Sequence, residues 1–153
     1  MLLHLYLRNK IVYLPTVAQT EAGFYIDIEP VKVVPAAESQ ALQNAILEIM
    51  AKGNPVVPTP TRAAFSKPVL LNYAKVKSWS AFEKNTSVWT IDKKGGKYYI
   101  TPGRSRADKG WEDDLPQMES LPLNAPLDTV AQRVAYLVLD RSRKLKRTGG
   151  AQS

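Results

Sequence analysis

Apolar and polar positions alternate at the start of the chain with the two-residue period of a strand. Three leucines in 3–7 alternate with His4 and Tyr6, which places the leucines on one face of a sheet. An Arg-Asn turn at 8–9 and a second apolar run at 10–14, closed by a proline, follow directly. This order predicts a β-hairpin.

Short apolar or alternating runs predict further strands. They lie at residues 23–28, 31–34, 69–73, 86–92, 97–101 and 118–121. The first two are either a strand pair or one long strand interrupted at Pro30. Residues 93–96, Lys-Lys-Gly-Gly, are typical of a hairpin turn. Residues 16–22 are expected to form a polar loop, and 103–117 a polar irregular segment. The proline-rich stretch 53–62 predicts a stiff extended crossing.

Two longer stretches have helical spacing. Apolar residues make one stripe over 41–50, with Gly53 placed where a helix C-cap favours glycine. A second stripe covers 127–138, and Ser78 predicts the N-cap of a short helical turn. The sum predicts an α+β fold: a twisted, mainly antiparallel sheet of five to seven strands with two principal helices packed on one face.

Composition places the chain among single globular domains. It has 153 residues, 44% hydrophobic and 23% charged, which argues against wholesale disorder. The absence of cysteine excludes a disulfide scaffold, a thiolate metal site and a cysteine nucleophile. No apolar run approaches the roughly 18 residues of a membrane span. The first residues lack the basic leader of a signal peptide, so a cytoplasmic protein is expected.

The formal charge of +7 is unevenly distributed. Segment 62–109 has a net charge of +8, segment 110–140 of −5 and segment 141–153 of +5. We therefore divide the chain into one α+β domain at 1–140 and a basic helix end with a flexible tail at 141–153. The tail is either an arm for phosphate or membrane surfaces, or a solubilising end whose cations suit the helix dipole.

No sequence motif indicates catalysis. The chain lacks a P-loop and a Gly-x-Ser-x-Gly elbow. Its only histidine, His4, is interpreted as a surface or satisfied side chain. The acids around 112–114 lack the alternation of a calcium loop. We expect no enzyme activity, no catalytic residue, no metal, no cofactor and no small-molecule substrate.

Two surface features remain. The basic segment 73–99 interleaves lysines with aromatic residues, which either stack nucleic-acid bases or lie in the core behind solvated lysines. Residues 111–114, Trp-Glu-Asp-Asp, place a large anchor within a negative rim, as in a surface that binds a basic partner. The alternative is a loop held down by one tryptophan.

Four unusual segments carry a resemblance to a known family. They are Val12-Tyr-Leu-Pro-Thr, Thr20-Glu-Ala-Gly-Phe-Tyr-Ile-Asp-Ile-Glu-Pro-Val, Gly53-Asn-Pro-Val-Val-Pro-Thr-Pro-Thr-Arg and Lys75-Val-Lys-Ser-Trp-Ser-Ala-Phe-Glu. In this order the sequence resembles the CdiI-type immunity proteins of bacterial contact-dependent growth inhibition systems, over residues 2–140. The resemblance implies a cytoplasmic protein that neutralises its cognate toxin domain, commonly a nuclease and often one that cuts tRNA. The family has no shared catalytic residue to carry over.

The expected partner is therefore the C-terminal toxin domain of the cognate CdiA protein, in a one-to-one complex without membrane or nucleic acid. Because nuclease clefts are basic, the acidic segment 110–140 is the expected contact surface. The predicted toxin-binding residues are Trp111, Glu112, Asp113, Asp114 and Glu119. The alternative function is an RNA- or DNA-binding module that uses the basic strands of 73–99 and the tail.

Overall fold

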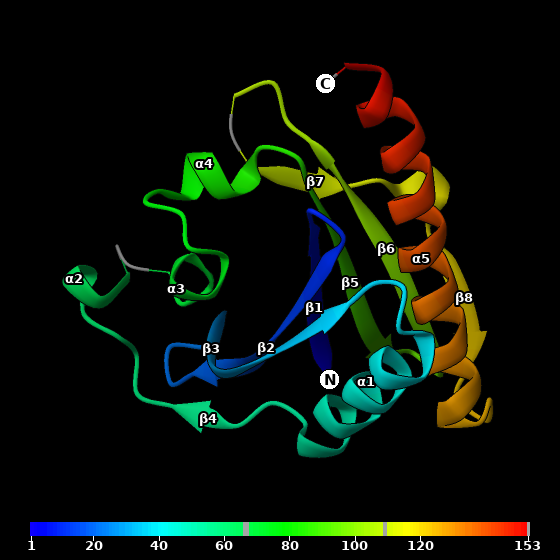
Figure 1. Cartoon of the computed structure of the whole chain (residues 1–153). Coiled ribbons are helices and arrows are strands. Elements are labelled where there is room, and N and C mark those ends of the chain that lie inside the picture. Colours follow the sequence, from blue (N-terminus) through cyan, green and yellow to red (C-terminus); the bar gives the residue numbers. More distant parts are fainter. Residues whose placement is uncertain (66–67, 109, 153) are drawn as a thin grey trace.

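A computed structural model of the chain describes the backbone of residues 1–65, 68–108 and 110–152, and their side chains except those of 64–65 and 146–152 (Figure 1). Its described part contains an eight-stranded sheet with the order β3-β2-β1-β5-β6-β7, in which β4 pairs with β2 and β8 pairs with β6. The strands are β1 (Leu2–Arg8), β2 (Ile11–Thr20), β3 (Tyr25–Pro35), β4 (Val56–Val57), β5 (Thr86–Lys94), β6 (Lys97–Ser105), β7 (Trp111–Asp113) and β8 (Glu119–Pro122).

All strand pairs are antiparallel except β2 with β4. The predicted α+β class is confirmed. The sheet has one strand more than the predicted range, because the segment predicted as irregular contributes β7 and the proline-rich crossing contributes β4. There the main chain hydrogen-bonds to β2: Gln19 N–H donates to Pro55 O at 2.9 Å.

Helices α1 (Ser39–Lys52) and α5 (Leu127–Gln152) cover one face of the sheet, as Figure 1 shows. The leucines of 3–7 point into the core beneath them, confirming the predicted alternation. Around them lie Val12, Leu14, Leu42, Ile46, Ile91, Ile100, Val134 and Val138, each at most 1% exposed. Burial of such a side chain contributes about 2 kcal/mol, so this apolar layer is the main support of the fold.

The opposite face has a cover that the sequence pattern did not predict. Three short helices, α2 (Arg62–Phe65), α3 (Leu70–Ala74) and α4 (Trp79–Glu83), lie on this side. Side chains from α3 and α4 pack on sheet residues in a second core. Its buried members are Tyr6, Tyr13, Val31, Leu70, Phe82 and Val88. The sheet is thus a middle layer. One of its faces packs against α1 and α5, and the other packs against α3 and α4.

Three predictions of local structure were wrong. Residues 103–117 were predicted as a polar irregular segment, yet they include the end of β6, strand β7 and the 3-10 helix η1 (Leu115–Gln117). Residues 69–73 were predicted as a strand, but Leu70–Ala74 is helix α3, ended by Lys75 at φ 57°. A short apolar run does not distinguish a strand from a buried helical turn. Residues 16–22 were predicted as a polar loop, yet β2 continues to Thr20. Thr16 and Thr20 are both buried, because β3 on one side and β4 on the other complete the pairing of β2.

Other boundaries differ by a few residues. The first turn is centred on Asn9 and Lys10, both with positive φ, rather than on 8–9. Strand β6 continues through Pro102 to Ser105, where 97–101 was predicted. The predicted caps are confirmed: the Ser78 side chain accepts a hydrogen bond from Ala81 N–H, and Gly53 ends α1 at φ 67°.

Candidate functional site

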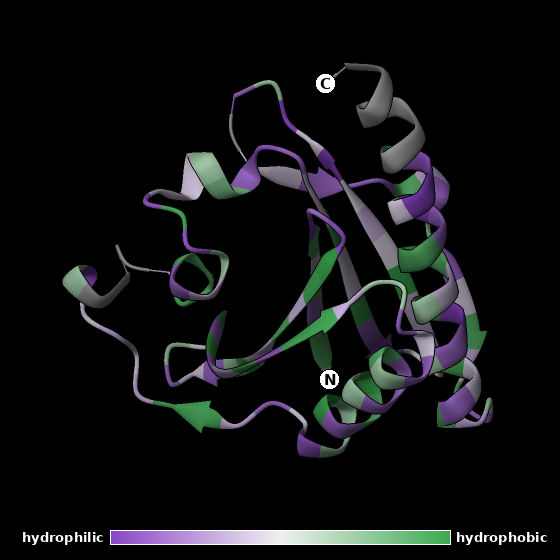
Figure 2. Ribbon diagram, viewed as in Figure 1, coloured by the Kyte–Doolittle hydropathy of each residue, from purple (hydrophilic) through white to green (hydrophobic). Residues whose placement is uncertain are grey.

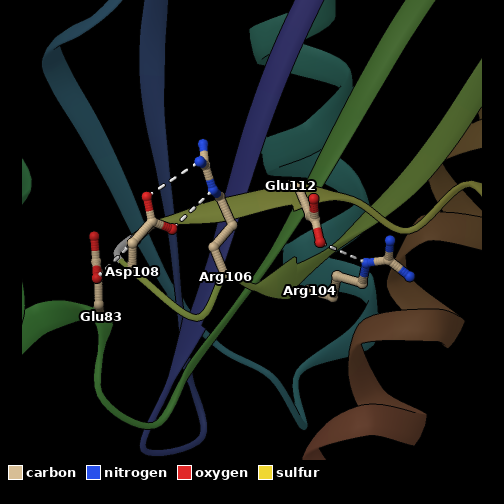
Figure 3. A network of polar contacts seen from close by, with 6 residues as sticks. Glu83, Arg104, Arg106, Asp108 and Glu112 are labelled. Atoms are coloured by element: carbon tan, nitrogen blue, oxygen red, sulfur yellow. Dashed lines mark hydrogen bonds and ion pairs between the residues drawn. The ribbon is translucent and has the colours of Figure 1, made fainter.

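Charged side chains gather where β6 meets β7. Figure 2 shows hydrophilic residues along this end of the sheet, whereas β1 and β2 are mainly hydrophobic. Across the pair, Arg104 Nε donates to Glu112 Oε1 at 3.0 Å (Figure 3). Beyond the strand end, Arg106 binds Asp108 through two hydrogen bonds of 3.1 Å. These pairs are exposed, so each contributes at most about 1 kcal/mol.

A hydrogen bond ties the β6–β7 connection to α4. Gly110 N–H donates to Glu83 Oε2 at 3.2 Å, and Gly110 has a φ of 76° that favours glycine. This contact fixes the approach of the chain to β7.

Trp111 faces the second core. Its ring centroid lies 6.0 Å from that of Tyr6 and 5.9 Å from that of Trp79. The residue is half-buried. Gly103, opposite Asp113 on β6, leaves room for this packing: a Cβ built there would lie 3.2 Å from the Trp111 Cβ. Trp111 therefore anchors β7 on the sheet.

The acids that follow Trp111 are at the surface. Glu112 and Asp113 are exposed and Asp114 is half-buried. They lead into η1 (Leu115–Gln117), where Leu115 is 61% exposed, and Met118 beyond it is 40% exposed. We call the five residues Glu112, Asp113, Asp114, Leu115 and Met118 the β7–η1 patch.

Glu119 has a different environment. Its carboxylate accepts hydrogen bonds from Arg133 Nε at 2.7 Å and from a terminal nitrogen of Arg133 at 2.9 Å. This bidentate pair joins β8 to α5, and the hydrogen bonds to Glu119 raise the pKa of Arg133 above its usual value. Four of the five predicted residues thus lie on β7 and directly after it, at 111–114. The fifth, Glu119 on β8, is bound to Arg133 of α5.

A cavity of about 400 Å³ lies beside the patch, between α5 and the end of β5, β6 and β7. Its walls come from Thr86, Ser87, Val88, Trp89, Pro102, Gly103, Arg104, Ser105, Trp111, Asp114, Gln117, Leu137, Asp140, Arg141 and Lys144. No sequence motif indicates this cavity, because its walls come from four segments that only the topology brings together. Trp111 and Asp114 belong both to the predicted site and to these walls.

The aromatic residues of segment 73–99 are largely structural. Phe82 is fully buried, and Trp89 and Tyr98 are each 5% exposed. Trp79, Tyr73 and Tyr99 are half-buried. Lysines do flank them, and the Lys93 Nζ lies 5.9 Å from the Tyr98 ring centroid. The three fully packed rings are not accessible for base stacking.

The single histidine has a partner on a distant strand. His4 Nδ1 lies 2.7 Å from Asp27 Oδ1, and Tyr6 donates to Asp27 Oδ2 at the same distance. This agrees with the interpretation of a satisfied histidine. Among the described residues, no three histidine, aspartate or glutamate side chains come together as a metal site.

Comparison with known proteins gives a fold but no family. No family model matches the sequence, and no curated protein matches it. Among solved structures, a protein of unknown function from Neisseria meningitidis is similar, with a TM-score of 0.61 and 14% sequence identity. The match covers 88% of this chain and 92% of that chain. At this identity the likeness shows a shared fold alone. In the part of the chain that the structure describes, no helix is long and apolar enough to span a membrane.

Proposed function

We propose that this chain is an immunity protein, which binds and neutralises the C-terminal toxin domain of a contact-dependent growth inhibition system. The proposal rests on the sequence resemblance over residues 2–140. The structural observation that supports it is the β7–η1 patch, where exposed Leu115 and Met118 follow three consecutive acids. Exposed apolar side chains bordered by charge are a common composition of protein interfaces.

The charge of the patch fits the proposed partner. A nuclease holds a polyanion, so its substrate cleft carries cations, and an acidic surface accelerates association with such a cleft. The net charge of +7 does not oppose this, because the patch belongs to the segment 110–140 with a net charge of −5. In this proposal the acidic end of the sheet faces the toxin.

The acids differ in whether their side chains already have an ion pair within the chain, and this difference sets how much each can contribute to toxin binding. The side chains of Asp113 and Asp114 have no ion pair among the described residues, so both can accept a partner's cation directly. Glu112 is paired with Arg104, but both side chains are at least half exposed, so exchanging this pair for an intermolecular one costs little. Trp111 positions the strand that carries the acids. Glu119 remains bound to Arg133 and contributes least.

Co-purification tests the proposal. The toxin domain encoded directly upstream carries the tag and is co-expressed with this protein. The complex is then purified at moderate and at high salt. A one-to-one complex of nanomolar affinity, about −12 kcal/mol, is expected. The variant Glu112→Gln/Asp113→Asn/Asp114→Asn should weaken it at least 100-fold, while the control Glu21→Gln/Glu38→Gln, with two exposed acids in other elements, should bind as before.

If the chain is instead a nucleic-acid-binding module, the same experiment should give no complex with the toxin. Without a complex, and with retention on RNA that falls steeply with salt, the basic strands and tail would be the functional surface. The burial of Phe82, Trp89 and Tyr98 speaks against stacking on that surface. A complex with toxin that the patch variant leaves unchanged would retain the immunity function and overturn its assignment to the patch.

A further inference from the structure

We propose that the cavity between α5 and the β5–β6–β7 end of the sheet binds an oxyanion, a phosphate or carboxylate group carried by a molecule of about mononucleotide size. Nothing in the resemblance assigns a small ligand to this chain. The inference rests on the cavity and not on the toxin proposal, so either can fail alone.

The strands and the helix converge on the cavity for simple geometric reasons. Trp89 on β5 is the register partner of Pro102 on β6, so Ser87 and Arg104, two residues along each strand, point to the same helix-covered face. On α5, the wall residues Leu137, Asp140, Arg141 and Lys144 follow the spacing of one helix face. The cavity is therefore formed by regular elements.

Two guanidinium groups reach it from opposite walls. Arg141 Nε donates to Ser87 Oγ at 3.2 Å, and Arg104 Nε donates to Glu112 Oε1 at 3.0 Å. Figure 3 shows the Arg104 guanidinium pointing toward α5. Each arginine is thus oriented through Nε, and its terminal nitrogens make no further hydrogen bond with the described residues. Paired terminal nitrogens are the donors that bind carboxylate and phosphate in a bidentate manner.

The acids of the wall cancel part of this charge, because the walls hold three cations and two acids. Asp140 is paired with Lys144, whose Nζ lies 2.9 Å from Asp140 Oδ2. Asp114 is the remaining wall carboxylate, and among the described residues it has no cation partner. It repels an anion and so limits the affinity of the cavity. Removal of this unpaired carboxylate should therefore strengthen anion binding.

The volume and the other walls indicate the size of the ligand. About 400 Å³ exceeds the space of one phosphate and lies in the range of small-molecule sites. Ser87, Ser105 and Gln117 supply polar contacts, whereas Leu137 and Trp111 supply apolar ones. A ligand with an anionic group and a partly apolar body satisfies both.

Titrations of the full chain, followed by backbone NMR shifts and calorimetry, test the site. The probes are inorganic phosphate, adenosine 5′-monophosphate, citrate and adenosine. The three anions, but not adenosine, should shift residues of the cavity wall. The monophosphate binding more tightly than citrate would identify a phosphate ligand, and the reverse order a carboxylate. Saturable shifts absent for all three anions would overturn the proposal.

Matched variants locate the donors. Arg141→Gln should weaken anion binding at least 10-fold, and Arg141→Lys should weaken it less, because charge is kept without the fork. The control Arg106→Gln removes an exposed arginine outside the cavity, so binding should not change. Equal losses in Arg141→Gln and Arg106→Gln would mean non-specific attraction and reject the site. Unchanged thermal unfolding confirms that each variant is folded.

Asp114→Asn separates this inference from the immunity proposal. It should raise anion affinity several-fold because the unpaired carboxylate is removed, and it should lower toxin affinity because a contact is lost. Weaker anion binding in this variant would overturn the cavity assignment without affecting the toxin complex. Unchanged toxin binding would count against the patch alone.

Discussion

The Tyr6 hydroxyl donates a 2.7 Å hydrogen bond to Asp27 Oδ2, although β2 lies between the strands that carry these residues. Tyr6 is on β1 and Asp27 on β3, so the bond crosses the face of β2. Burial first, and then the charge and hydrogen bond of Asp27, raise the pKa of Tyr6 well above 10.0. The phenol thus stays protonated in the folded chain at pH values where an unfolded tyrosine ionises.

This raised pKa predicts a loss of stability in alkali. Below pH 10 both states hold the Tyr6 proton, so its contribution is complete. Above pH 10 the unfolded chain releases the proton and the folded chain does not, so the free energy of unfolding falls by about 1.4 kcal/mol per pH unit, until the folded pKa is passed. Urea unfolding between pH 8 and 11 measures this. Tyr6→Phe should remove one such contribution, leaving that of Tyr13, whose pKa burial also raises. An equal slope in both proteins would contradict the assignment.

Gly103 is expected to tolerate no larger residue. A Cβ at this position would lie 2.4 Å from Val88 Cγ1, so Gly103→Ala forces a side chain or strand to shift and should cost about 1–3 kcal/mol. The double variant Gly103→Ala/Val88→Ala relieves the clash, and its cost should be less than the sum of the single costs. Denaturant unfolding of the three variants gives the coupling. Additive costs would show that Val88 is not the obstacle.

Asn54 is expected to be the most important polar side chain of the proline-rich crossing. It accepts from Leu2 N–H at 2.9 Å and donates to Leu2 O and Val17 O at 2.8 Å each. It thereby joins β1 and β2 where their own pairing has ended. Asn54→Ala should destabilise the fold by about 2–4 kcal/mol. The control Asn44→Ala removes an exposed helix amide and should change stability little. Thermal unfolding compares the two, and similar effects would refute this role.

The pair of Glu119 and Arg133 is expected to serve α5 docking and not toxin binding. Their side chains are 35% and 40% exposed, so Glu119→Gln should cost at most about 1 kcal/mol of stability because solvent screens the pair. Toxin affinity should change less than three-fold. Calorimetric titration of the variant with the toxin domain measures it. A loss comparable to that of the triple patch variant would restore Glu119 to the interface.

Much of the fold could be predicted because single elements carry their own pattern. The leucine alternation of β1, the apolar stripes of α1 and α5, and the glycine turn between β5 and β6 are local signals. Helix α3 and the end of β2 are not local. Leu70 on α3 is buried in the second core together with Tyr6 and Phe82, and Thr20 is extended where β4 pairs with it. Both depend on residues far away in sequence.

The same limit applies to the site. The acids beside Trp111 could be found as a charge cluster, because they are consecutive. The difference between Asp113, which has no ion pair among the described residues, and Glu119, which Arg133 holds, depends on the path of α5 over β8. The pairing of Arg141 with Ser87 and of His4 with Asp27 likewise joins segments that no sequence motif connects.

The first strand of the chain is also the centre of the sheet. Its neighbour β2 begins at Ile11, but its other neighbour, β5, begins at Thr86. During synthesis at roughly 5–20 residues per second, the free edge of β1 therefore waits about 4–17 s for its partner. Throughout that interval the nascent chain exposes an unpaired central strand next to the leucines that later form the core. The interval before β5 is made is thus the period in which the unpaired edge of β1 is most exposed to association with other unfinished chains.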